Sequence, residues 1–462
     1  MAGVAAGAAG ETRTPPAPTV VDRETYGALE RTLWLAAYVV AVLAPLALML
    51  VAGKPGDRSF GVVLGAGLGF AGLTMLVLQM VMPSRARVFT APFGIDLLLR
   101  FHRQIGAVAL GLVVAHVAVL VIDDPVRLAL LNPLDAPGRA RAGLAALVAL
   151  ALLVASSTWR RALGLRYEPW RALHVVLGAL VIAASFAHAI GVSQYLATGT
   201  IRWAVLALVV VAAGALFYLR VGRPFAAAGR PYRVVEVRPE RGGATTLELE
   251  SAAGAAPAMF EAGQFAWLKL ARAPYSLSEH PFSYSSSASR PERPEFTIKA
   301  VGDFTEGVRL IAPGTDVLLD GPHGSLRPAD PRASYVLIAA GVGITPIVSI
   351  LRTMADEGDD RPLLLVYGSR SWEEITFRER LEELERRLTL SVVHVLSEPS
   401  SNWEGERGRI DARLLAAVLP PATRDWNHFV CGPPAMVDSV ERSLEQLGID
   451  RERVHAERFI SA

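Results

Sequence analysis

The sequence predicts a multi-domain protein: a six-helix transmembrane bundle, then an antiparallel β-barrel, then an α/β domain with a parallel sheet. Of the 462 residues, 52% are hydrophobic and only 19% are charged, which is too apolar for an ordinary soluble protein of this length. Six apolar segments fill the first half, and short β-patterned runs followed by alternating strands and helices fill the second. We place a disordered N-terminal tail at 1–29, the bundle at 30–222, the barrel at 229–327 and the α/β domain at 333–462.

Most of the apolar segments approach the ~20 residues that are needed to cross ~30 Å of hydrocarbon. Arginines concentrate in the loops that would share one side with the N-terminus, so the positive-inside rule places both termini in the cytoplasm. We therefore expect a multi-pass protein of the cell membrane (plasma or inner membrane), with the lipid bilayer as its surroundings. The predicted segments are 34–52, 60–82, 105–122, 144–158, 173–191 and 203–219.

Charge and cysteine content exclude several classes of protein. Residues 1–221 hold 18 Lys and Arg against 10 Asp and Glu, whereas residues 222–462 hold 28 against 34. No basic patch interleaved with aromatic residues occurs, so we expect no nucleic-acid partner. The single cysteine, Cys431, excludes an intrachain disulfide framework and a four-cysteine iron–sulfur cluster within this chain.

Four of the nine histidines lie in or at the ends of two apolar segments. His102 and His116 are 14 residues apart on the third segment, and His174 and His188 are 14 apart on the fifth. In an α-helix, 14 residues rise about 21 Å and complete nearly four turns, so each pair faces one way at opposite leaflets. Because both segments run outward, we expect His102 to face His174 and His116 to face His188.

Two imidazoles that face each other suit a haem iron, because two axial nitrogens saturate it for electron transfer. Ionisable residues inside a membrane are functional by default. The alternatives are hydrogen bonds to neighbouring helices, a proton relay or a transition-metal site. The runs 101–106 (FHRQIG) and 170–174 (WRALH) resemble the ferric reductase-like transmembrane domain. That resemblance implies two b-type haems, with His102, His116, His174 and His188 as the iron ligands.

In the predicted barrel, the run 280–286 (HPFSYSS) offers what a flavin site requires. Phe282 offers an aromatic wall for the ring, Ser283 a hydroxyl near N5, and the serines further donors; a merely polar strand is the alternative. The stretch from Lys299 to Thr305 ends a strand at Gly302 and begins a short helix, whose free N–H groups can hold a pyrophosphate.

Three further motifs predict a nucleotide site in the α/β domain. The run 335–346 (YVLIAAGVGITP) is a buried strand that turns through Gly341 and Gly343 into a helix, where a phosphate can approach the backbone. Arg370 ends the second strand, at the edge where ligands of open α/β sheets bind, and could hold the 2′-phosphate of NADPH. A solvated loop arginine, and NADH as the donor, remain alternatives. Cys431 ends another strand at the same edge, or is a small core residue.

Taken in order, these motifs and the terminal run 457–459 (ERF) resemble the ferredoxin–NADP reductase superfamily. The resemblance implies catalytic contacts at Ser283, Cys431 and Phe459, with Phe459 covering one flavin face. It implies FAD contacts at His280, Pro281, Phe282, Ser283, Ser285, Lys299, Gly302 and Thr305. It implies NADPH contacts at Gly341, Val342, Gly343, Ile344, Thr345, Pro346, Arg370, Cys431, Gly432 and Pro433.

The two resemblances together imply an enzyme that passes electrons from cytosolic NADPH (or NADH) through FAD and two haems b to an extracytoplasmic acceptor. The acceptor is a ferric iron chelate or dioxygen, and a protein partner is not identified. A flavin fits between the donor and the haems because it exchanges both hydrides and single electrons. The alternatives are a membrane-tethered NAD(P)H-flavin reductase that serves a cytoplasmic redox partner without haem, and a histidine-lined transport or binding protein.

Overall fold

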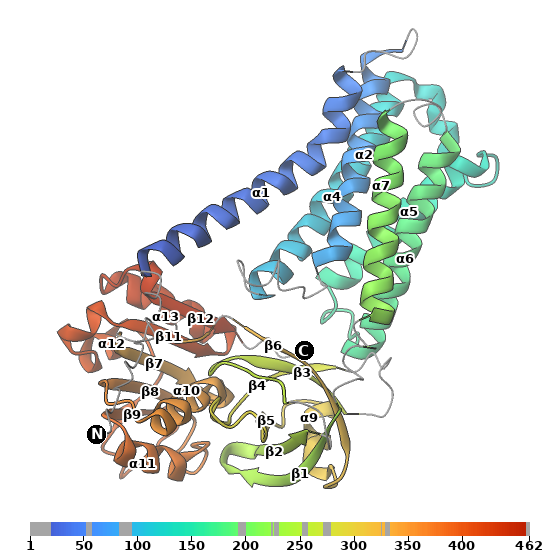
Figure 1. Cartoon of the computed structure of the whole chain (residues 1–462). Coiled ribbons are helices and arrows are strands. Elements are labelled where there is room, and N and C mark those ends of the chain that lie inside the picture. Colours follow the sequence, from blue (N-terminus) through green and yellow to red (C-terminus); the bar gives the residue numbers. More distant parts are fainter. Residues whose placement is uncertain are drawn as a thin grey trace, which may run out of the picture.

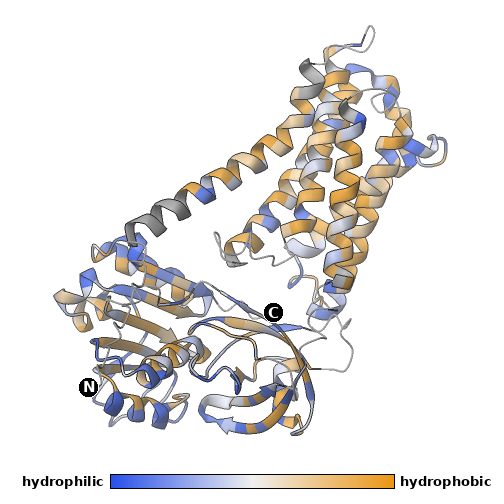
Figure 2. Ribbon diagram, viewed as in Figure 1, coloured by the Kyte–Doolittle hydropathy of each residue, from blue (hydrophilic) through white to orange (hydrophobic). Residues whose placement is uncertain are grey.

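The computed structural model describes residues 20–51, 58–82, 95–192, 200–222, 225, 231–251, 257–270, 279–324, 326–328 and 333–458. A helical region forms one body, and two sheet-based units form the rest (Figure 1). Hydrophobic residues run along the helices of the bundle, whereas hydrophilic residues recur throughout the sheet-based units (Figure 2). This order of units agrees with the prediction, while the predicted boundaries between the units stay predictions.

Six main helices form the bundle, but only five are long and apolar enough to cross a membrane among the described residues. The sixth, α7, contributes a shorter apolar stretch, Arg202–Phe217, and its 18 residues rise about 27 Å. The first helix begins at Val20, inside the predicted tail 1–29. The helices are α1 (Val20–Val51), α2 (Phe60–Val81), α4 (Ile95–Asp123), α5 (Gly138–Thr158), α6 (Tyr167–Val192) and α7 (Thr200–Phe217).

Helix α2 is the most enclosed of these spans. Its residues Phe70, Leu73 and Val77 pack in one apolar cluster with Phe186 of α6 and Val205 of α7. Large apolar side chains elsewhere on the bundle stay exposed in the isolated chain, as expected where lipid rather than protein covers a helix. These outward residues include Val108, Val114, Val176, Leu180 and Val210.

The first sheet-based unit is a six-stranded antiparallel sheet in the order β4-β3-β6-β1-β2-β5. An isolated bridge between Tyr284 and Phe296 joins the end of β4 to β5, so the two edge strands meet, as they do in a closing barrel. Alternating side chains such as Leu247, Leu249 and Leu268 fill its interior. The strands are β1 (Pro231–Glu240), β2 (Ala244–Ser251), β3 (Phe265–Lys269), β4 (His280–Ser283), β5 (Glu295–Lys299) and β6 (Asp316–His323).

The second unit is a parallel sheet in the order β10-β9-β8-β7-β11-β12, with helices that cover both faces. The four strands that the sequence predicts at 334–340, 362–367, 390–396 and 428–431 are present, and the structure adds β10 and β12 at the two edges. The strands are β7 (Tyr335–Ala340), β8 (Leu363–Ser369), β9 (Leu390–Leu396), β10 (Glu406–Arg407), β11 (Asn427–Gly432) and β12 (Val454–Arg458). The main helices are α10 (Ile344–Glu357), α11 (Arg378–Arg387), α12 (Ala412–Val418) and α13 (Pro434–Gln446).

Polar contacts fix the two sheet-based units against each other through α10. Ser349 donates to the backbone carbonyl of Ser286 at 2.7 Å, and Arg352 donates to the carbonyl of Ser285 at 2.9 Å. Arg352 also pairs with Glu295 of β5 at 2.8 Å. The strand that carries the predicted flavin motif therefore lies on the first helix of the nucleotide unit.

Candidate functional site

The four membrane histidines lie in two facing pairs, as the 14-residue spacing predicts. The ring centroids of His102 and His174 are 6.1 Å apart, and those of His116 and His188 are 6.2 Å apart. Two bonds of about 2 Å from one metal to two imidazole nitrogens, extended by the ring radius at each end, put the centroids ~6 Å apart. Each pair thus has the separation that one shared iron requires.

The pair His116 and His188, the outer pair of the predicted topology, is held by the backbone of two neighbouring helices. The Nδ1 of His116 lies 2.7 Å from the carbonyl oxygen of Gly65, and the Nδ1 of His188 lies 2.7 Å from that of Arg139. A carbonyl oxygen only accepts, so Nδ1 carries the proton in both rings and Nε2 keeps the lone pair that a metal needs.

A glycine four residues after each carbonyl makes this contact possible. A Cβ at Gly69 would lie 2.9 Å from the Nδ1 of His116, and a Cβ at Gly143 would lie 2.7 Å from the Nδ1 of His188. Residues four apart lie on the same helix face, so a larger side chain at either position would displace the ring from the carbonyl. The same carbonyl-and-glycine arrangement therefore occurs twice.

In the pair His102 and His174, the inner pair of the predicted topology, a side chain holds His174. Ser157 donates to the carbonyl of Leu153 at 2.7 Å, so its oxygen accepts from the Nδ1 of His174 at 3.2 Å. Trp170 lies one helical turn before His174, with ring centroids 5.3 Å apart. Its indole Nε1 is buried and donates no hydrogen bond within the described residues. An unused donor beside the inner pair fits an acidic group such as a haem propionate.

Both pairs therefore fit b-type haem by geometry and by ligand chemistry. Within the described ranges, no group of three or more His, Cys, Asp or Glu side chains gathers to ligate a metal. A pair of imidazoles leaves four coordination positions to be filled, which is the number that a porphyrin supplies. His102 with His174, and His116 with His188, are the residues that would hold the two haems.

The predicted flavin motif lies on β4, beside an aromatic stack. Ser283 is buried, and its Oγ has no hydrogen-bond partner among the described residues, which leaves it available to a ligand. His280 stacks on Phe304 at 3.9 Å between ring centroids, and Phe282 lies 6.1 Å from Phe304. Burial lowers the pKa of His280, although Glu168 acts to raise it, so the ring is neutral near pH 7. Pro281 lies between the two aromatic positions.

Two residues predicted to contact the flavin, Thr305 and Ser285, form hydrogen bonds through their hydroxyl groups to other groups of the protein. The Oγ1 of Thr305 accepts from the backbone N–H of Gly302 at 2.9 Å and donates to its carbonyl at 2.9 Å, which caps α9 (Asp303–Gly307). The Oγ of Ser285 lies 2.9 Å from Thr297 in the interior of the antiparallel sheet. Lys299 ends β5, close to α9. Cofactor roles for these residues stay predictions.

The predicted nucleotide motifs meet at one edge of the parallel sheet. The order of the strands reverses at β7, which has β8 on one side and β11 on the other. Ala340 pairs with Gly368 and Ala339 pairs with Cys431, so the three segments that follow these strands emerge together. Open α/β sheets bind ligands at this switch point. The segments are Gly341, Val342, Gly343, Ile344, Thr345 and Pro346; then Arg370; then Cys431, Gly432 and Pro433.

Two of these glycines are required by the backbone. Gly341 has a φ of 56°, a left-handed conformation that side chains disfavour. Gly343 lies against the backbone of Cys431, where a side chain would collide with the Cys431 carbonyl. Cys431 itself is fully buried. The turn therefore packs closely on β11 and leads directly into α10.

Arg370 lies near two glutamates at this edge of the parallel sheet. Its guanidinium is 3.9 Å from Glu374 and 3.7 Å from Glu398, and its side chain is 63% exposed. Such loose pairs contribute little stability, so the cation is available to an anionic ligand. The 2′-phosphate role of Arg370 remains a prediction.

The predicted flavin cover Phe459 lies outside the described residues. Strand β12 ends at Arg458, which pairs with Asp438 at 2.8 Å and also with Glu441 of α13. A side chain at Gly324 would meet the carboxylate of Glu457 at 3.5 Å. The end of β12 is therefore directed toward the antiparallel sheet.

The contact between the bundle and the antiparallel sheet was not predicted from the sequence. Arg171 donates to Glu279 at 2.6 Å, directly before β4, and Lys269 lies 3.5 Å from the other Glu279 oxygen. Tyr167 lies 6.3 Å from His280 between ring centroids. Nothing in the sequence around Arg171 or Glu279 signals this contact, because the two residues lie 108 positions apart.

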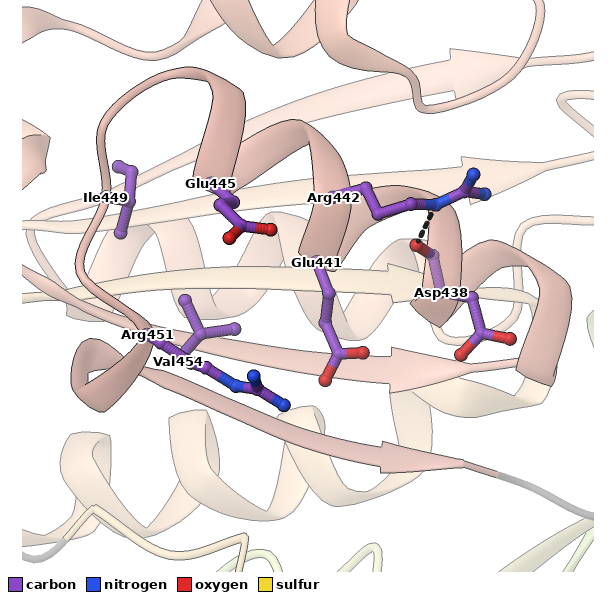
Figure 3. Close-up of a pocket in the computed structure, with 7 residues that line it drawn as sticks. All are labelled: Asp438, Glu441, Arg442, Glu445, Ile449, Arg451 and Val454. Carbon is purple, nitrogen blue, oxygen red and sulfur yellow. Dashed lines mark hydrogen bonds between the residues drawn. The ribbon is translucent and has the colours of Figure 1, made fainter.

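A surface hollow lies elsewhere, between α13 and β12 (Figure 3). Its lining is charged, and the Nε of Arg442 donates to the carbonyl of Asp438 at 3.0 Å. None of the predicted site residues lines it. The lining residues are Asp438, Glu441, Arg442, Glu445, Ile449, Arg451 and Val454.

Comparison with known proteins identifies both halves of the chain. Residues 68–185 match the family described as ferric reductase like transmembrane component, and residues 337–442 match the oxidoreductase NAD-binding domain. Ferredoxin–NADP reductase B of Sorangium cellulosum is 33% identical over 241 residues, which are 49% of this chain and 96% of that protein. The ferredoxin reductase component of 3-ketosteroid-9-alpha-monooxygenase of Rhodococcus rhodochrous is 31% identical over 207 residues, 44% of this chain and 56% of that protein.

One solved structure is similar to the second half. The flavohem-like FAD/NAD binding domain of nitric oxide dioxygenase from Vibrio cholerae has a TM-score of 0.45 and 24% sequence identity. The match covers 50% of this chain and 98% of that domain.

Proposed function

Because this chain belongs to the ferredoxin–NADP reductase family in its second half and carries a ferric reductase-like transmembrane domain in its first, we propose that this NAD(P)H-dependent oxidoreductase transfers electrons across a membrane. The donor is NADPH or NADH on the cytoplasmic side. The acceptor is a small molecule on the opposite side, either a ferric chelate or dioxygen.

The observation that carries this proposal is the pair of facing histidine couples in the bundle. Their centroid separations of 6.1 and 6.2 Å suit one iron each, and the 14-residue spacing separates the two couples by about 21 Å along the helices. A helix bundle that served only as an anchor would need neither couple. Two such couples in series supply positions for electron carriers at both leaflets.

The cofactors divide the chemistry between them. When bound, FAD exchanges the two electrons of a hydride for single electrons, and the haem irons carry single electrons. Phe282 and Ser283 would hold the flavin ring, and the switch-point segments with Arg370 and Cys431 would hold the nicotinamide nucleotide. The carbonyls of Gly65 and Arg139 keep the proton on Nδ1 of the outer histidines and so present Nε2 to the iron.

The orientation follows from the arginines and from the contact between the units. Arg160, Arg161, Arg166 and Arg171 lie at the end of the bundle that meets the antiparallel sheet. The positive-inside rule makes that end cytoplasmic. The inner couple, His102 with His174, then lies on the side of the nucleotide site, in a cell membrane with both termini inside.

Absorption spectra of the purified full-length protein test the proposal. We expect two b-type haems per chain and reduced-minus-oxidised bands that appear on adding NADPH without oxygen. Flavin reduction with no haem signal, even with adequate haem supply during expression, would instead establish a membrane-tethered reductase for a cytoplasmic partner. Binding of neither nucleotide nor flavin would point to a histidine-lined transport protein. Parallel assays of superoxide and of ferric chelate reduction would then identify the acceptor.

A further inference from the structure

A continuous row of aromatic rings joins the predicted flavin motif to the inner histidine couple. Starting in the antiparallel sheet, the centroid separations are 3.9 Å from Phe304 to His280 and 6.3 Å from His280 to Tyr167. They are then 5.8 Å from Tyr167 to Trp170 and 5.3 Å from Trp170 to His174. We call these five residues the aromatic row.

The row crosses the boundary between the bundle and the antiparallel sheet, and a buried ion pair lies at the crossing. Arg171 and Glu279 are 2.6 Å apart, with side chains only 21% and 8% exposed. Each is the chain neighbour of a member of the row, because Arg171 follows Trp170 and Glu279 precedes His280. Lys269 of β3 is 3.5 Å from the same carboxylate and completes a charged cluster. Figure 1 shows the first turns of α6 beside this sheet.

A second cation, Arg160, lies near the two rings of the row that belong to the bundle. The guanidinium carbon of Arg160 lies 5.7 Å from the ring centroid of Tyr167 and 5.6 Å from that of Trp170. Both distances lie within the range of a cation–π contact. Arg160 therefore contacts both rings of the row that belong to the bundle, while Arg171, the chain neighbour of Trp170, pairs with Glu279.

An interfacial aromatic belt would explain only part of this arrangement. Membrane proteins enrich Trp and Tyr where lipid meets water, which accounts for the presence of Tyr167 and Trp170. It does not account for their continuation to a buried histidine of the flavin motif and to Phe304, nor for an ion pair that joins the two units at that point. His280 is only 7% exposed, so its ring faces its neighbours rather than water.

We propose that electrons leave the flavin site for the inner histidine couple along the aromatic row. The Arg171–Glu279 pair keeps the rings of the row in contact where the row crosses from the antiparallel sheet to the bundle. The inference rests on the proposed function. In each passage, one electron leaves the reduced flavin and converts one ferric haem iron to ferrous. Two passages return the flavin to its oxidised form, and the hydrogen received with the hydride leaves as a proton on the cytoplasmic side. The rings of the row are not consumed.

Stopped-flow spectroscopy of the full-length protein, loaded with FAD and haem, tests the path. Trp170→Leu removes the aromatic ring at position 170, whereas Trp170→Phe keeps an aromatic ring there. The control Trp159→Leu changes an exposed tryptophan at the same end of the bundle. After mixing with NADPH, we expect Trp170→Leu to slow haem reduction about tenfold or more, because small losses of contact carry large kinetic costs. Flavin reduction stays unchanged, and haem reduction is compared per bound haem because both Trp170 variants remove the indole donor. If Trp170→Leu loses haem, Tyr167→Leu carries the same test.

The outcomes separate this inference from the proposed function. Near-normal haem reduction in Trp170→Phe and Trp159→Leu, with slow reduction in Trp170→Leu, supports the path. Wild-type haem reduction in both Trp170→Leu and Tyr167→Leu overturns it and leaves the proposed function standing. A wild-type protein whose haems NADPH does not reduce overturns the proposed function and the path with it.

Hydrogen exchange tests the ion pair without any turnover. In Arg171→Ala we expect faster amide exchange in β4 and in the first turn of α6, because the pair no longer holds the two units together. The matched control Arg161→Ala removes an exposed arginine of the preceding loop and should leave exchange unchanged. Unchanged amide exchange in Arg171→Ala would show that the pair does not hold the two units together at the aromatic row. Arg171→Lys should restore most of the protection.

Discussion

The helix bundle and the sheet-based half of the chain hold their candidate sites by different means. In the bundle, the outer histidines are held by backbone carbonyls beside glycines, at Gly65 with Gly69 and at Arg139 with Gly143. In the sheet-based units, charged side chains make the corresponding contacts, such as Arg352 with Glu295 and Arg241 with Glu379. Charges are costly in lipid, whereas backbone carbonyls are already present on every helix. Steric changes should therefore disturb the candidate sites of the bundle. Changes in charge or pH should instead affect the sheet-based half.

The largest effect is expected from removing an inner ligand. His174→Ala should reduce haem content from two to one per chain and stop NADPH-driven reduction of the remaining haem, while NADPH still reduces the flavin. The matched variant is His188→Ala, which removes an outer ligand and should leave the inner haem reducible by NADPH. Haem content and anaerobic spectra measure both. Reduction of the outer haem in His174→Ala at the wild-type rate would contradict the series arrangement.

A steric change at a glycine should remove the outer haem without touching a ligand. In Gly143→Val the added side chain meets the His188 ring, since even a Cβ would lie 2.7 Å from Nδ1. We expect haem content to fall from two to one per chain. The control is Gly111→Val on α4, where a Cβ would meet nothing within 4 Å and two haems should remain. Two haems in Gly143→Val would show that the carbonyl contact does not position the ring.

A change of charge should destabilise the sheet-based half of the chain. Arg352→Met removes the closest cation of the buried Glu295 but leaves Arg238 at 3.2 Å, so it should cost about 2 kcal/mol of stability. The release of flavin fluorescence on heating the full-length protein measures the effect. Arg290→Met is the control, because Arg290 is 69% exposed and its pair with Asp356 is 3.5 Å long, so it should change stability by about 0.5 kcal/mol or less.

The same variant predicts a pH dependence. Burial acts to raise the pKa of Glu295, but the hydrogen bonds and charges of Arg352 and Arg238 together outweigh it and hold the pKa below its ordinary value. A lowered pKa contributes stability above the unfolded value of about 4.3, and this contribution is lost as the pH falls through the folded value. The difference between wild type and Arg352→Met should therefore shrink as the pH falls below about 4. A difference that stayed constant from pH 7 to pH 3 would contradict this assignment.

The smallest effect is expected at the exposed nucleotide edge. Arg370→Ala should raise the KM for NADPH about tenfold more than the KM for NADH if the guanidinium binds the 2′-phosphate. Steady-state kinetics with both donors measure it, and Arg386→Ala, an exposed arginine of α11, is the control. Equal effects on the two donors would show that Arg370, which lies between Glu374 and Glu398, does not distinguish them.

Local patterns predicted much of the fold. The apolar segments, the strands β1 to β9 and β11, and the helices between the later strands follow from periodicity and from Gly and Pro signals. Strands β10 and β12 were missed because the first has two residues and the second, Val454–Arg458, is an edge strand with little apolar pattern. The predicted segment 203–219 ends two residues after α7 because apolar residues continue past Phe217, where the regular α-helix ends.

The sequence by itself determined the identity and spacing of the four membrane histidines and the order of the nucleotide motifs. A repeat of 14 residues places the two histidines of each helix on one face at opposite ends, which follows from the periodicity of the chain alone. Only the tertiary structure decided what holds those rings. The carbonyls of Gly65 and Arg139 come from other helices, and the Arg171–Glu279 pair joins residues 108 positions apart. Such contacts depend on how elements pack, which no local pattern encodes.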